Sequence, residues 1–264
     1  MLSGLIIYSK IDKEKNAWFI NRCIESLTKK GVSFSYLDED DVLVYLENHM
    51  ADFVIYRARD YRLLEVLEAK GIRSFNNSLT NKTANDKYLT YQFLNKHNIA
   101  CIPSFLSIVE IDQFPAVMKS VDGHGGQEVF LLNAKEDAKL YQKPNKRYIF
   151  QNFYPNDGDL RLYVLNKKVI GAVIRHNELD FRSNFSLGGE VSEYQPEEEL
   201  IKTAERIALL LNADYIGVDF LKVKNQWLAN EIEDPVGARM LFKASGLDVT
   251  SLLTDYIFAS LRNK

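Results

Sequence analysis

Three carboxylates in the last quarter of the chain have the types and spacing of a divalent-cation site. Asp219 interrupts the apolar segment 217–221, and Glu231 and Glu233 follow two positions apart. A turn centred near Asn225 predicts an antiparallel strand pair in which Asp219 lies opposite Glu231. Glu231 and Glu233 share a face because side chains alternate along a strand. Such oxygen ligands suit Mg²⁺ or Mn²⁺ together with phosphate oxygens, so the spacing predicts a metal site.

A solvated sheet face is the alternative for these three acids. In that case, their charges would pair with lysines such as Lys222. Without any cation the carboxylates would repel one another, and at least one would have to take up a proton. The metal interpretation is favoured because Asp219 interrupts an otherwise apolar segment.

A glycine-rich loop follows an apolar strand that ends in a lysine. The strand is expected at 116–119, it ends in Lys119, and three glycines come soon after. These are Gly123, Gly125 and Gly126. Glycines allow a loop to direct its N–H groups at phosphate, and a nearby ammonium neutralises phosphate charge. An ordinary hairpin joining 116–119 to 128–132 explains the loop equally well, so both interpretations stay open.

Three arginines lie on or beside expected strands. They are Arg161, Arg175 and Arg182. The guanidinium fork matches phosphate and carboxylate oxygens. Each arginine alone is weak evidence, but together with the loop and the acids they indicate a site for a polyphosphate, a divalent cation and an anionic substrate.

The first third of the chain alternates strands with helices. Strands are expected at 5–9, 32–37, 52–57 and 72–75, with helices around 18–27, 38–50 and 63–70. Gly31 and Gly71 follow the first and third helices, as C-terminal glycines do. This βαβαβαβ order predicts a small, mostly parallel sheet covered by helices.

The rest of the chain is richer in strands. Helices are expected at 80–96, 196–212 and 248–262, and strands at 104–108, 116–119, 128–132, 148–151, 160–165, 168–175, 216–223 and 226–232. The fold class is therefore α/β followed by α+β.

Composition excludes several classes of protein. The 264 residues are 46% hydrophobic with a net charge of −3, which supports a sizeable core and gives no reason to expect a nucleic-acid surface. Cys23 and Cys101 can form neither a disulfide framework nor a CxxC metal site. There is no signal-peptide pattern, and no apolar run approaches the ~18 residues that span a bilayer, so no membrane association and a cytoplasmic location are expected. P-loop and GxGxxG motifs are absent.

Taken in order along the chain, the motifs resemble those of the ATP-grasp superfamily, in particular the RimK-like carboxylate–amine ligases. The resemblance runs from about residue 76 to 237 and rests on segments 85–87, 118–126, 151–153, 159–161, 180–184, 188–189, 217–219 and 231–233. It implies an ATP-grasp fold with a preATP-grasp lobe at 1–77, an ATP-grasp domain at 78–264, and a smaller lid at about 100–150.

The resemblance also implies a role for each matching residue. ATP would be bound by Lys87, Lys119, Gly123, Gly125, Gly126, Gln151, Asn152, Phe153, Asp159, Arg182, Ser183 and Asn184. Arg161, Arg175 and Arg182 would act on the transferring phosphoryl group or the acyl-phosphate. Asp219, Glu231 and Glu233 would ligate two Mg²⁺ or Mn²⁺ ions. The family has Asn where Glu233 stands, and the added charge implies stronger cation binding.

The implied activity is formation of an amide or peptide bond through an acyl-phosphate, with release of ADP and phosphate. The substrates would be a small-molecule or peptide carboxylate and an amine. The alternative is an ATP-binding regulatory or scaffold module on the same fold that has lost turnover. The sequence leaves a homo-oligomer open.

Overall fold

The computed structural model describes residues 2–126, 128–155, 159–176 and 190–262. Its first sheet is parallel, with strand order β2-β1-β3-β4. The strands are β1 (Ser3–Tyr8), β2 (Ser33–Asp38), β3 (Phe53–Tyr56) and β4 (Arg73–Phe75). The helices of this part are α1 (Lys10–Lys15), α2 (Ala17–Lys29), α3 (Val42–Tyr45) and α4 (Tyr61–Ala69), with the 3-10 turn η1 (Glu39–Asp41). The expected parallel sheet is confirmed.

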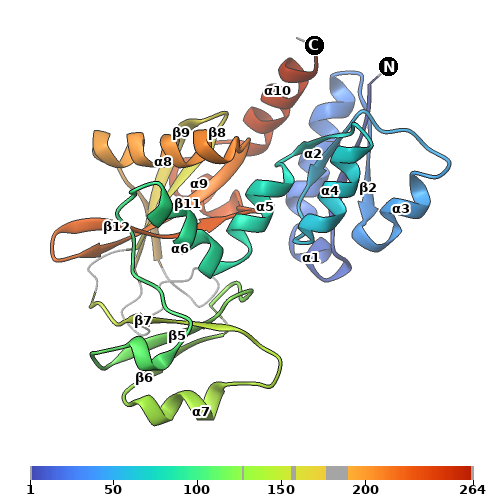
Figure 1. Ribbon diagram of the computed structural model, residues 1–264. Helices are drawn as coiled ribbons and strands as arrows, with labels where there is room; N and C mark the ends of the chain where they lie inside the picture. Colours follow the sequence, from blue (N-terminus) through green and yellow to red (C-terminus); the bar gives the residue numbers. More distant parts are fainter. Residues whose placement is uncertain (1, 127, 156–158, 177–189, 263–264) are drawn as a thin grey trace.

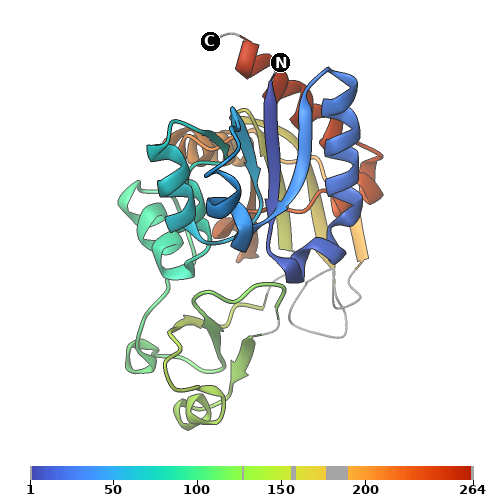
Figure 2. The same ribbon diagram turned by 90° about the vertical axis from the view of Figure 1, so that its right-hand side faces the viewer.

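Alternating side chains give this sheet two buried faces. Ile6 and Tyr8 of β1 pack with α2, whereas Leu5 and Ile7 pack with α4. Figure 2 shows α2 and α10 (Val249–Arg262) on one side of the sheet and α4 on the other. Gly31 has a φ of 77°, the left-handed geometry that ends a helix such as α2 without strain.

The second sheet has five antiparallel strands in the order β10-β9-β8-β11-β12. They are β8 (Asp159–Leu165), β9 (Lys168–His176), β10 (Glu190–Glu193), β11 (Tyr215–Val223) and β12 (Gln226–Glu233). Helix α8 (Glu198–Leu211) covers one face and packs on Leu160 and Leu162. Because side chains alternate, Asp159 and Arg161 of the same strand belong to the opposite face. The apolar pattern on α8 therefore fixes which polar residues face away from it.

A third, smaller sheet has the order β6-β5-β7 and lies apart from the other two (Figure 1). Its strands are β5 (Ala116–Ser120), β6 (Val129–Leu132) and β7 (Tyr148–Asn152). Helix α7 (Ala138–Tyr141), with the 3-10 turns η2 (Ile108–Glu110) and η3 (Lys135–Asp137), completes this part. It has its own small core, which includes Met118 and Phe150. The sequence-based domain boundaries remain a prediction, although this sheet lies within the range expected for the lid.

Several expected elements differ from the structure. The single helix at 80–96 is two helices, α5 (Ser78–Ala84) and α6 (Lys87–Lys96), because the side chain of Asp86 caps the second by accepting from Tyr88 N and Leu89 N at 2.9 Å. The helix at 38–50 is reduced to η1 and α3. The expected strand at 104–108 contributes only the isolated bridge from Phe105 to Phe150.

Besides the 3-10 turns η2 and η3, four short elements were not predicted. They are α1, α7, β10 and α9 (Arg239–Ser245). Each has at most seven residues, too few for hydrophobic periodicity to identify it. Within the described ranges, no helix is long and apolar enough to cross a membrane.

Candidate active site

A cavity lies between the three-stranded and five-stranded sheets and encloses about 910 Å³ of space that is partly open to solvent. The predicted residues that line it are Lys87, Lys119, Gly123, Gly125, Gly126, Gln151, Asn152, Phe153, Asp159, Arg175, Asp219, Glu231 and Glu233. The cavity thus brings together residues from the expected ATP and metal sites.

Asp219 lies at the centre of a buried cluster of charges. Arg161 donates to it through Nε and Nη2, both at 2.6 Å, in a bidentate pair. Arg175 donates Nη2 to Asp219 Oδ2 at 2.8 Å and also to Asp159. Arg161 comes from β8, which is next to β11, and Arg175 comes from β9 on the other side of β8 in the same sheet. Three adjacent strands therefore hold Asp219 in place.

The two acids that share Arg175 have opposite pKa shifts. Burial opposes ionisation of Asp219, but the charges of Arg161 and Arg175 outweigh burial and hold its pKa well below the usual range. Burial raises the pKa of Asp159, and the charge of Arg175 only partly offsets that rise. Asp219 is therefore the stronger acid of the two.

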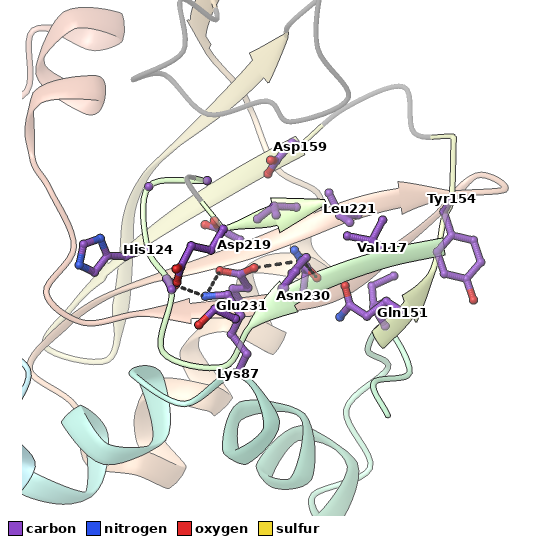
Figure 3. Close-up of a pocket in the computed structure, with 18 of the residues that line it drawn as sticks. Lys87, Val117, His124, Gln151, Tyr154, Asp159, Asp219, Leu221, Asn230 and Glu231 are labelled. Carbon is purple, nitrogen blue, oxygen red and sulfur yellow. Dashed lines mark hydrogen bonds and ion pairs between the residues drawn. The ribbon is translucent and has the colours of Figure 1, made fainter. Parts of the chain in front are cut away.

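Glu231 bridges the two sheets that form the cavity. Lys119, on β5 of the small sheet, lies 3.1 Å from Glu231 Oε1, and Lys87, at the start of α6, lies 3.3 Å from Oε2. Figure 3 shows Lys87 and Glu231 pointing toward each other, with Asp219 and Asn230 beside them. Burial raises the pKa of Glu231, but the charges of Lys87 and Lys119 outweigh burial and lower it to about 2. Glu231 is therefore an anion held by cations from two other parts of the molecule.

The predicted turn at Lys224 and Asn225 and the predicted pairing of Asp219 with Glu231 are confirmed, but the register between them is not regular. Lys224 and Asn225 form a two-residue turn, both with positive φ. This turn alone would place Asp219 opposite Asn230. A bulge beside Asp219 leaves Asn230 as the extra residue and restores the pairing with Glu231.

The expected repulsion among the three acids is neutralised by side chains of the protein itself. Arg161 also donates to Glu233 Oε1 at 2.7 Å, so each of the three acids contacts a cation. The expectation that one must be protonated unless a cation is bound overlooked these partners. Lys222 is not among them, since its ammonium lies over the ring of Trp227. Because each acid is turned toward a cationic side chain, the described residues contain no group of three or more ligands already arranged to hold a metal.

The far end of the cavity is more apolar and offers an unused hydrogen-bond acceptor. Val117, Ile102 and Leu221 line it beside Asn152. The buried Oδ1 of Asn152 has no hydrogen-bond partner in the described part of the chain. Apolar side chains beside a free acceptor suit a heteroaromatic ring that carries an amino group.

The glycine-rich loop is both a hairpin connection and a wall of the cavity. It joins the antiparallel strands β5 and β6, and its Gly123 carbonyl accepts from Lys87 Nζ at 2.6 Å. Gly125 and Gly126 have φ of 65° and 74°, which side chains rarely adopt. The two interpretations left open by the sequence are therefore compatible with each other.

The remaining predicted residues lie outside the cavity lining or outside the described ranges. Arg161 is buried behind Asp219 and Glu233 and does not line the cavity. Arg182, Ser183 and Asn184 lie outside the described residues, so their roles stay predictions. Sequence reasoning did not select Asn230, whose Oδ1 lies 3.4 Å from Lys119 Nζ, because the bulge that points it there leaves no pattern in the sequence.

The fold and cavity define an ATP-grasp protein, and comparison with a family model narrows the class. The RimK-like ATP-grasp domain model matches residues 84–257. The match covers more than half of the chain, so the protein belongs to the RimK-like ATP-grasp family. This confirms the resemblance and the fold class expected from the sequence.

Relatives and solved structures agree with this membership. "Uncharacterized protein MG011" of Mycoplasma genitalium is 30% identical over 98% of this chain and 93% of its own length. "Probable alpha-L-glutamate ligase" of Haemophilus influenzae (strain PittEE) is 27% identical over 74% of this chain and 70% of its own length.

Two solved ligases share the fold at low sequence identity. The D-alanine–D-alanine ligase of Bacillus anthracis, complexed with ATP, has a TM-score of 0.77 at 16% identity and covers 99% of this chain and 98% of its own. The ATP-grasp ligase PsnB, complexed with minimal precursor, Mg and ADP, has a TM-score of 0.70 at 16% identity and covers 97% and 96%. Both are solved with a nucleotide, and PsnB also with magnesium.

Proposed function

We propose that this protein uses ATP to join a carboxylate to an amine through an acyl-phosphate, releasing ADP and phosphate. Its family and the ligases among its relatives support this enzyme class. The observation that carries the proposal is the charge pattern around one cavity. Four acids, Asp159, Asp219, Glu231 and Glu233, contact four cations, Lys87, Lys119, Arg161 and Arg175.

The cavity fits ATP along its length. The apolar end beside Asn152 suits adenine, whose amino group can donate to the unpartnered Oδ1. The opposite end presents the ammonium groups of Lys87 and Lys119, which suit phosphate oxygens. Arg175 Nε is also buried without a hydrogen-bond partner among the described residues, so it can take a further acceptor there.

Magnesium fits the chemistry of the acids in this cavity, which offer only carboxylate oxygens. Glu231 and Glu233 are the more exposed ligands, at 22% and 34%, so these two can exchange a cationic partner for the ion most easily. Bound magnesium would supply charge neutralisation for the triphosphate. The charges of the four acids and the four cations around the cavity cancel. Two divalent ions would then balance the four negative charges of ATP, so we propose that two ions bind.

The residues of this chain would act by positioning and charge neutralisation. A carboxylate oxygen attacks the γ-phosphorus and ADP leaves, and the amine nitrogen then attacks the acyl carbon, loses a proton and displaces phosphate. Lys87 and Lys119 neutralise the transferring group, and the buried arginines fix Asp219. The loop at Gly123–Gly126 shields the acyl-phosphate from water.

An ADP-release screen tests this function. Purified protein is given ATP, magnesium and a panel of amino acids and short peptides, alone and in pairs, with manganese in a parallel series. We expect ADP to form only when both a carboxylate and an amine are present, and mass spectrometry to find the condensed product. ATP binding without turnover across the whole panel would favour the regulatory or scaffold module instead.

A further inference from the structure

The segment that follows Glu233 is held by three asparagine side chains. We call Asn76, Asn81 and Asn85 the asparagine clamp. Asn76 Nδ2 donates to Asp234 Oδ1 at 2.9 Å, and Asn81 Nδ2 donates to Asp234 Oδ2 at 3.1 Å. Asn85 Nδ2 donates to the main-chain oxygen of Asp234 at 2.7 Å. All three oxygens of Asp234 therefore accept hydrogen bonds from amides of the clamp.

Two members of the clamp are themselves fixed by other hydrogen bonds. Asn76, just after β4, accepts from Asp214 N at 2.6 Å and from Tyr215 N at 2.8 Å, and it donates to Tyr215 O at 2.7 Å. Asn81 also donates to Ala58 O at 3.0 Å. Their side chains are buried, at 3% and 0% exposed. The clamp therefore ties the residue after Glu233 to the parallel sheet and to the start of β11.

The third member, Asn85, lies two positions before the lysine that holds Glu231. That lysine is Lys87, whose ammonium is 3.3 Å from Glu231 Oε2. The short segment between α5 and α6 thus contacts the end of β12 twice, at Glu231 through Lys87 and at Asp234 through Asn85. Glu233 lies between these two contacts. Asn85 and Glu233 also line the same small cavity, which shares Glu231 and Glu233 with the ATP cavity.

The clamp donates through neutral amides, and this matters beside a proposed magnesium ligand. Glu233 pairs with Arg161 at 2.7 Å and has to exchange this partner for the ion. A cationic donor in place of Asn85 would add a positive charge to the cavity that Glu233 lines, and it would repel magnesium. An amide holds the main chain without adding charge. The end of β12 can therefore stay in place while the Glu233 side chain changes partner.

We propose that the asparagine clamp positions Glu233 for a magnesium ion by fixing the main chain at Asp234. This inference rests on the metal site of the proposed function. The three asparagines act through Asp234, so they are positioning residues. Groups that orient a metal ligand typically change metal affinity by about 10- to 100-fold when they are removed. Without Asn85 the end of β12 is less restrained, and Glu233 is held less often where it can bind the ion.

Binding of Mn²⁺, measured by electron paramagnetic resonance, tests the clamp without requiring turnover. Mn²⁺ replaces Mg²⁺ because it gives a signal, and the protein is kept in excess over a non-hydrolysable ATP analogue so that little free nucleotide competes for the ion. The variant is Asn85→Ala, which removes a side chain that caps the end of α5 and donates to two main-chain oxygens. We expect it to weaken Mn²⁺ binding by about tenfold.

The matched control is Asn77→Ala. Asn77 caps the start of the same helix and also donates to two main-chain oxygens, those of Leu211 and Asn212, at 3.0 Å and 2.9 Å. Both variants should lower Tm, whereas only Asn85→Ala should weaken Mn²⁺ binding. Asn85→Ser is a second variant in case Asn85→Ala does not fold, since its side chain is too short to keep the bond to Asp234. It should weaken Mn²⁺ binding in the same way.

The outcomes separate the clamp from the ligase proposal. If Asn85→Ala, or Asn85→Ser in its place, binds Mn²⁺ as tightly as the wild type does, the clamp is overturned. An equal loss in Asn77→Ala also overturns it. In the ADP-release assay, Asn85→Ala should raise the Mg²⁺ concentration for half-maximal rate more than it lowers the rate at saturating Mg²⁺. Mn²⁺ binding that depends on Asn85, without ADP release on any substrate pair, supports the clamp and contradicts the ligase function.

Discussion

Asp219 and Glu231 are paired residues of neighbouring strands, but different parts of the molecule hold them. Asp219 is held by arginines of its own sheet, and its side chain is only 6% exposed. Glu231 is held by lysines from α6 and the small sheet, and it is 22% exposed. One acid therefore belongs to the interior of a sheet, whereas the other links separate parts. The same pair of strands therefore supplies two kinds of charge. The position of Asp219 is fixed within its sheet, whereas the partners of Glu231 depend on how the two sheets are placed.

The largest effect should come from Asp219→Asn. Removing this charge leaves buried Arg161 with Glu233, and buried Arg175 with Asp159, as the remaining acidic partner, and breaking a buried ion pair typically costs about 3–5 kcal/mol of unfolding free energy. ADP formation should also fall by two or more orders of magnitude. Denaturant unfolding measures the loss of stability, and the ADP assay measures the loss of activity. The control is Asp255→Asn, an exposed acid paired with Lys30. If the Asp219 variant were as stable as the wild type, the proposed difference between Asp219 and Glu231 would be wrong.

Lys119→Gln tests the other side of the comparison. Its ammonium joins the small sheet to Glu231, so we expect ADP formation to fall by roughly 100-fold while the unfolding free energy changes by less than about 1–2 kcal/mol. Lys139→Gln, on exposed α7 of the same small sheet region, is the control. A stability loss as large as that of Asp219→Asn would show that the two acids are not held differently.

Asp234 extends the comparison because it is buried like Asp219, but its carboxylate accepts hydrogen bonds from two asparagine amides. Asn76 and Asn81 donate to its two oxygens at 2.9 Å and 3.1 Å. Burial raises its pKa to about 6, since these hydrogen bonds offset burial only in part. Its folded pKa lies above its unfolded value, so the folded protein keeps a proton that the unfolded chain loses between about pH 4 and pH 6.

The stability of the wild type relative to Asp234→Asn should therefore fall as pH rises through that interval. The expected change is on the order of 2 kcal/mol, from a shift of about two pH units. Urea unfolding of both proteins at pH 4, 5, 6 and 7 measures it. A difference that stays constant, or grows with pH, would show that burial does not dominate at Asp234.

Much of this arrangement could be predicted from the sequence because it follows from local periodicity. The alternation of strands and helices predicted the parallel sheet, whereas the predicted partner of Asp219 is right only because a bulge shifts the register by one residue. The cationic partners of the acids could not be assigned in the same way. Lys87 and Lys119 lie more than 100 positions from Glu231, and only the packing of separate parts brings them together.

The break between α5 and α6 had a local signal that periodicity obscured. Asp86 is a favourable helix cap, but the apolar residues on either side of it continue a helical spacing. The bulge at Asn230 had no such signal, since nothing in the residue type marks it as unpaired. Connections between parts of the molecule therefore required the structure.

Isotope transfer tests the central claim most directly. A carboxylate substrate found in the ADP-release screen is labelled with ¹⁸O in both oxygens and incubated with ATP, magnesium and the amine. An acyl-phosphate route transfers one ¹⁸O from the carboxylate to the released phosphate, because the acyl carbon–oxygen bond breaks when the amine attacks. We predict phosphate carrying one ¹⁸O in equal amount to the amide product. Amide formation with unlabelled phosphate would contradict the mechanism.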